Sequence, residues 1–115
     1  MKALRVERGV EFRKIPLEML FMFHAVMKAA DAQGAAPTIT GAAYNGYPAG
    51  KVHDQGYAID VRIRDVPDPA SYAETIRSIL GAVSPHYVIL YGDEGHRDHI
   101  HIGFAWAFSS EARGG

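Results

Sequence analysis

YAIDVRIR, residues 57–64, alternates aliphatic or aromatic residues with small or charged ones. The aliphatic positions include Ile59 and Val61, and Asp60 lies between them. Successive side chains of a β-strand point to opposite faces, so this pattern predicts a strand with one buried face. We therefore expect Asp60 on the face opposite the aliphatic residues.

One helix is predicted before this strand in the sequence, and a second one after it. Apolar residues recur at helical spacing over residues 17–33, between Pro16 and Gly34, which predicts a buried helix that ends at the glycine. Asp68 followed by Pro69 is typical of a helix start. An apolar stripe follows that start, formed by Tyr72, Ile76, Ile79, Leu80 and Val83.

Three further segments have strand character. They are PTITGAAY from Pro37, HYVILYG from His86 and HIHIGFAW from His99. This order of helices and strands predicts an α+β fold, with a small, mainly antiparallel sheet and helices packed on one side. The length of 115 residues fits a single domain over residues 1–108, followed by a loose tail at 109–115.

Composition narrows the possible partners. Hydrophobic residues make up 48% and charged residues 22%, and the net charge is -1, as in a soluble globular domain. This balance predicts no nucleic-acid or membrane partner, and no apolar run is long enough to span a bilayer. We expect a monomer. There is no cysteine, so a transition-metal site must use imidazole and carboxylate ligands.

The segment IPLEMLFMFHAVMKAADA has the apolar run of an export signal. Glu18, His24 and Lys28 interrupt that run, which argues against export. We therefore expect cytoplasmic synthesis without a signal peptide. His24, among apolar neighbours, is interpreted as a packed core histidine.

Two polar segments are candidates for a metal site. HDQGYAID, residues 53–60, holds His53 and Asp60, which can converge on one ion if the chain turns at Gly56. HRDHIHIGF, residues 96–104, places His99 and His101 on one face of a strand. A catalytic zinc needs three protein ligands and an open position for water, and either imidazole could reach the ion.

HDQGYAID resembles the S-x-H-x-x-G-x-A-x-D signature of the zinc D-alanyl-D-alanine peptidase family, and DHIH resembles its D/E-x-x-H and H-x-H signatures. That family includes bacterial D-alanyl-D-alanine carboxypeptidases and dipeptidases and phage L-alanyl-D-glutamate endolysin peptidases, and the hedgehog signalling domain shares its fold. The resemblance implies a hedgehog-like fold and a zinc metallopeptidase that cuts the stem peptide of peptidoglycan. Such a protein would act on the cell wall if phage lysis released it or if a particle carried it.

The resemblance also implies residue roles. His53, Asp60 and His101 match the Zn²⁺ ligands, and Asp98 matches the carboxylate general base. His99 would lie in the active site without binding the metal, and His96 would be an exposed loop residue. A regular strand would point Asp98 away from His99 and His101, unless Asp98 precedes the regular pairing.

The chain departs from the family pattern at two positions. Lys51 stands where the family has a serine, and the arginine of the preceding strand is missing from ITGAAYNG. Arg62 and Arg97 are candidates to replace that arginine. Without it we lean toward an endopeptidase, although L-alanyl-D-glutamate, crossbridge and D-alanyl-D-alanine bonds all stay open.

Two other functions are considered. One is a non-catalytic zinc domain that binds a peptide or a protein, and the other is a zinc hydrolase, such as an amidase, that acts on other substrates. Tyr44 and Tyr47 precede His53 and would either line a substrate cleft or cover a core edge. Trp106 is interpreted as core or edge packing.

Overall fold

Two helices and five strands form the described part of the chain, which in this computed structural model comprises residues 1–44, 57–93 and 95–104. The elements follow in the order β1 (Arg5–Val6), α1 (Leu17–Gln33), β2 (Thr38–Ala43), β3 (Tyr57–Arg62), α2 (Pro69–Gly81), β4 (Tyr87–Leu90) and β5 (His99–Phe104). His53, Tyr47, Trp106 and the predicted tail at 109–115 lie outside the described residues.

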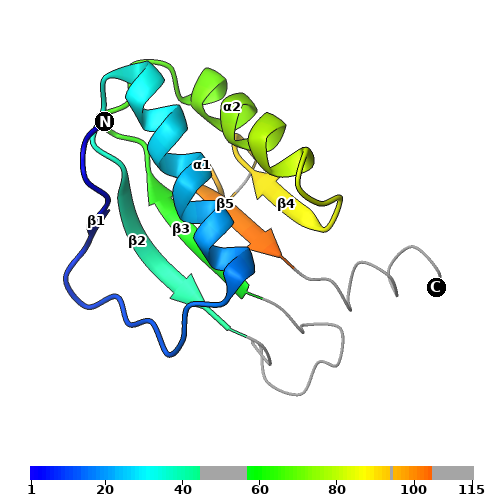
Figure 1. The fold of residues 1–115 in the computed structure, drawn as a ribbon. Coiled ribbons are helices and arrows are strands. Elements are labelled where there is room, and N and C mark those ends of the chain that lie inside the picture. The colour runs from blue at the N-terminus through cyan, green and yellow to red at the C-terminus, as the bar shows by residue number, and fades with distance from the viewer. Residues whose placement is uncertain (45–56, 94, 105–115) are drawn as a thin grey trace.

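The strands form one sheet in the order β1-β2-β3-β5-β4. β1 runs parallel to β2, and the three other pairs are antiparallel. Both helices lie on the same face of this sheet (Figure 1). The predicted α+β class, with a mainly antiparallel sheet, is confirmed. The two-residue strand β1 was not predicted, because so short a segment has no recognisable alternation.

Helix α1 spans residues 17–33, as its sequence boundaries predict. Gly34 adopts a left-handed conformation with φ 68°, and its N–H bonds back to the last turn of the helix. Glycine has no Cβ to oppose that conformation, so the helix ends there. The buried face of α1 consists of Met19, Met22, Ala25, Val26, Ala29 and Ala30.

This buried face differs from the predicted one. Leu17, Leu20 and Phe21 belong to the apolar pattern but are exposed. His24 is also exposed, so its interpretation as a packed core histidine is wrong. His24 lies two residues from both Met22 and Val26, which places it about 200° around the helix from each of these buried positions. The first turns of α1 carry apolar residues on several sides, so periodicity alone did not identify the packed face.

Helix α2 begins at the predicted signal. The carboxylate of Asp68 accepts a hydrogen bond from the backbone N–H of Ser71 at 3.1 Å, and Pro69 occupies the first turn. The helix buries Tyr72, Ile76 and Leu80 from the predicted stripe, and Ala73 beside them. Val83 lies beyond the helix and is exposed. None of the helices in the described ranges is long and apolar enough to cross a membrane.

The central strands have one apolar and one polar face. Ile59 and Val61 of β3, with Ile100 and Ile102 of β5, are buried in the core under the helices. Side chains alternate along a strand, so Asp60, Arg62, His99 and His101 belong to the opposite face. The fold therefore brings Asp60 of the first motif segment and His99 and His101 of the second to the face of the sheet that α1 and α2 leave uncovered.

Candidate metal centre

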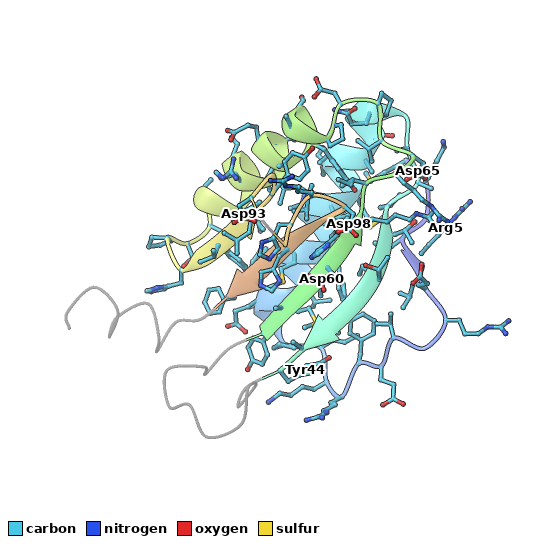
Figure 2. The ribbon with its side chains drawn as sticks, turned by 180° about the vertical axis from the view of Figure 1, so that it is seen from behind. Arg5, Tyr44, Asp60, Asp65, Asp93 and Asp98 are labelled. Atoms are coloured by element: carbon cyan, nitrogen blue, oxygen red, sulfur yellow. The ribbon has the colours of Figure 1, made fainter. Side chains whose placement is uncertain are left out.

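Asp60 and His101 are direct neighbours on the polar face. They are register partners on the antiparallel strands β3 and β5, and Nδ1 of His101 lies 3.1 Å from Oδ1 of Asp60. A carboxylate can only accept, so the imidazole donates this hydrogen bond. Figure 2 views this face and shows Asp60 on β3, with Tyr44 on one side and Asp93 and Asp98 on the other. Two predicted ligands, 41 residues apart in the chain, thus meet at bonding distance.

The electrostatics of Asp60 favour the charged carboxylate. The hydrogen bond from His101 lowers the pKa of Asp60, partial burial opposes this shift, and His101, His99 and His96 add favourable charge interactions. Asp60 therefore stays anionic to a lower pH than an ordinary aspartate does. An anionic oxygen beside an imidazole nitrogen is the donor pair that a zinc ion prefers when no thiolate is present.

His99 is held between two carboxylates. Its Nδ1 lies 2.8 Å from Oδ1 of Asp98, and its Nε2 lies 3.7 Å from Oδ1 of Asp60. The hydrogen bond with His99 lowers the pKa of Asp98. As the sequence allowed, β5 begins at His99, so Asp98 precedes the regular pairing. Its side chain nevertheless stays 91% exposed, and its carboxylate reaches His99 rather than the Asp60–His101 pair.

His96 is a fifth member of this group that the sequence interpretation left out. Its ring centre lies 5.4 Å from that of His99 and 5.7 Å from that of His101, and its side chain is only 25% exposed. The prediction of an exposed loop residue without a role is therefore wrong about its surroundings. Asp93 accepts a hydrogen bond from Nδ1 of His96 at 2.5 Å. The D-x-x-H spacing of DEGH, repeated in DHIH, was the available signal.

Gly41 provides the space for the Asp60 carboxylate. It is the register partner of Asp60 on β2, next to an irregularity in the pairing between Ile39 and Gly41. A Cβ atom at Gly41 would lie 3.0 Å from Oδ2 of Asp60, which is tighter than ordinary contact. The absence of a side chain at this position lets the carboxylate lie against the neighbouring strand.

The two candidate arginines differ in position. Arg62 is the register partner of His99 and shares the polar face with it. Its guanidinium lies 3.5 Å from the carboxylate of Asp65, and its buried Nε has no hydrogen-bond partner among the residues that the structure describes. Arg97 is exposed. Arg62 is thus the better placed of the two, although its visible partner is Asp65.

Tyr44 has a packing role in this structure. Its hydroxyl donates a hydrogen bond to the carbonyl of Lys14 at 2.7 Å, and its ring packs edge-on against Tyr57 at 6.2 Å between ring centres. These contacts tie the segment before α1 to the ends of β2 and β3. They match the interpretation of a residue that covers a core edge.

The residues that could hold a metal form pairs rather than a complete set. Across residues 1–44, 57–93 and 95–104, no three histidine, aspartate or glutamate side chains already converge on one ion position. The Asp60–His101 pair nevertheless has the spacing of two ligand atoms on one tetrahedral zinc, which lie about 3.3 Å apart. Binding through Nδ1 would require His101 to carry its ring hydrogen on Nε2 instead. His53, the expected third ligand, lies outside the described residues. The donor atoms present fit zinc chemistry.

Comparison with known proteins finds no family model that matches the chain, no matching curated protein and no matching solved structure. The family resemblance therefore rests on the motifs themselves and on the geometry of the residues that they contain.

Proposed function

We propose that the protein is a zinc metallopeptidase that hydrolyses an amide bond in the stem peptide of peptidoglycan, on a hedgehog-like fold. The observation that carries this proposal is the contact between Asp60 and His101 across β3 and β5, at 3.1 Å. Asp60 belongs to the first motif and His101 to the second. If the two motifs resembled the family only by chance, their side chains would not be expected to meet. His53 would complete the ligand set.

The residues have separable roles. Asp60, His101 and His53 would bind Zn²⁺, which supplies a bound water of lowered pKa and polarises the scissile carbonyl. His99 presents Nε2 to the site, where it can hydrogen-bond the substrate. Asp98 holds Nδ1 of His99 at 2.8 Å and so fixes the ring orientation. In the proposed reaction Asp98 is the general base, which accepts a proton from the attacking water and later gives it to the leaving amine.

Digestion of purified peptidoglycan tests this proposal. The zinc-loaded protein should release new amino groups, and mass spectrometry of the soluble fragments identifies the bond that is cut. His24→Ala is the matched control, because His24 is an exposed histidine on α1, on the other side of the sheet. His101→Ala should abolish both metal retention and hydrolysis. A metal-loaded protein that releases nothing from peptidoglycan would refute the proposal.

A non-catalytic zinc domain is the second candidate. The exposure of Asp98 favours it, because its carboxylate is 91% exposed and bonds to His99, away from the Asp60–His101 pair. Such a domain would bind a peptide and leave it intact. Asp98→Asn separates the two candidates: a peptidase loses turnover and keeps its metal, whereas a binding domain shows no turnover in either form.

A further inference from the structure

Each imidazole of the group has a carboxylate at Nδ1. Asp93 partners His96 at 2.5 Å, Asp98 partners His99 at 2.8 Å, and Asp60 partners His101 at 3.1 Å; the last carboxylate is also an expected metal ligand. Asp93 and Asp98 are exposed, at 55% and 91%, and within residues 1–44, 57–93 and 95–104 each forms an ion pair with one histidine only. His96 and His99 therefore form a chemically similar pair that is distinct from Asp60–His101.

The turn between β4 and β5 fixes His96 in place. The backbone N–H of Gly92 bonds to the carbonyl of His96 at 2.7 Å, and the N–H of His96 bonds to the carbonyl of Asp93 at 3.0 Å. Gly92 and Gly95 adopt positive φ angles of 90° and 95°, which this reversal requires. The ring of His96 is thus held by both its backbone and its side chain beside His99.

The tautomers of the pair leave the metal-binding atoms free. A carboxylate at Nδ1 accepts the imidazole hydrogen, so in the neutral ring Nε2 keeps its lone pair. A carboxylate behind a histidine is the usual outer partner of a metal-binding imidazole. Two imidazoles on one tetrahedral zinc place their ring centres about 5 Å apart. The 5.4 Å between His96 and His99 is close to that separation.

We propose that His96 and His99 bind a second divalent ion of the zinc class through their Nε2 atoms, next to the Asp60–His101 pair. Oδ1 of Asp60 lies 3.7 Å from Nε2 of His99, so the two positions are adjacent. Within the described residues no third side chain converges with the two imidazoles, so the second position is the weaker of the two. This site goes beyond the proposed single-zinc peptidase and does not depend on it.

Occupation of the second position also has a catalytic consequence, and this part does rest on the proposed function. An ion on Nε2 of His99 removes the atom that the proposed mechanism offers to the substrate. Zinc in excess should therefore inhibit hydrolysis, and His96→Ala should relieve that inhibition.

Calorimetric titration of the metal-stripped, full-length protein with ZnCl₂ at neutral pH tests the second site. The wild-type protein should show one tight and one weaker binding event. His96→Ala and His99→Ala should each lose the weaker event and keep the tight one, whereas His101→Ala should lose the tight one. His24→Ala is the control and should keep both. Asp93→Asn should weaken the second event about tenfold, as removal of an outer carboxylate does.

The outcomes separate this inference from the proposed function. A single event in the wild-type protein that His96→Ala leaves unchanged overturns the second site and leaves the peptidase proposal standing. A single event that His96→Ala weakens also overturns the second ion, because His96 would then bind the first. No binding at all overturns both proposals. If the weaker event persists in both His96→Ala and His99→Ala, it belongs elsewhere on the protein.

Discussion

Gly41 and Asp60 face each other across β2 and β3 so closely that a Cβ atom on Gly41 would lie 3.0 Å from Oδ2 of Asp60. The carboxylate of a proposed zinc ligand is therefore positioned by the absence of a side chain on the neighbouring strand. This contact links the geometry of the sheet directly to that of the proposed metal centre.

Gly41→Ala should displace the Asp60 carboxylate. We expect a loss of about 1 kcal/mol in the free energy of unfolding, in the range of mild overpacking, and a roughly tenfold loss of zinc affinity, as for changes in outer-shell contacts. Urea unfolding and competition with a chromophoric chelator measure the two effects. Gly81→Ala is the control, since a Cβ there meets nothing within 4 Å. Unchanged zinc affinity in Gly41→Ala would contradict this role of the glycine.

Asp98→Asn should separate catalysis from metal binding. Loss of a general base lowers turnover by about 10² to 10⁴-fold, while Asp60 and His101 keep their contact. Turnover on peptidoglycan fragments and zinc content of the same samples give both quantities. A variant that retains full turnover would remove Asp98 from the mechanism.

The charge of Asp60 should make the stability of the metal-free protein depend on acidic pH. The hydrogen bond from His101 holds the folded-state pKa of Asp60 below its ordinary value of 3.8. The carboxylate therefore contributes stability at pH values above that ordinary value, and the contribution disappears as the pH falls through the lowered folded-state pKa. Unfolding of wild-type and Asp60→Asn protein should therefore differ by a constant amount above about pH 5, and the difference should disappear under strongly acidic conditions. A difference that does not change with pH would contradict the assignment.

Tyr87 should limit stability on the alkaline side. Its buried hydroxyl donates a 2.7 Å hydrogen bond to the carbonyl of Glu18, and burial raises the pKa of Tyr87 to about 12. The folded protein therefore loses stability as the pH rises from the ordinary tyrosine value of 10 toward 12. Tyr87→Phe should cost about 1 kcal/mol at neutral pH, and this cost should shrink in alkali. Equal costs at neutral and alkaline pH would show that the hydroxyl is not the cause.

Features of the fold that depend on local sequence patterns were predicted correctly. Pro16 and Gly34 bound α1 at the expected residues, and the alternation in β3 and β5 placed Asp60, His99 and His101 on one face. These features follow from steric limits on the backbone and from side-chain alternation, both of which act within a few residues.

The features that were missed depend on contacts between distant segments. His96 joins the other histidines because the turn after β4 folds back, and periodicity carries no information about a turn of this kind. The packed side of α1 depends on the sheet beneath it, so the exposure of His24 and Leu20 did not follow from helical spacing. Asp98 precedes the regular pairing of β5, yet its carboxylate bonds to His99 rather than to the Asp60–His101 pair, a side-chain direction that the sequence pattern does not determine.

The most direct test of the proposed metal centre is the zinc content of dialysed wild-type and His101→Ala protein, measured together with the release of amino groups from peptidoglycan. We expect the wild-type protein to retain zinc and release amino groups, and the variant to do neither. A wild-type protein without zinc, or a His101→Ala variant with wild-type metal content, would contradict the claim that Asp60 and His101 bind a catalytic metal.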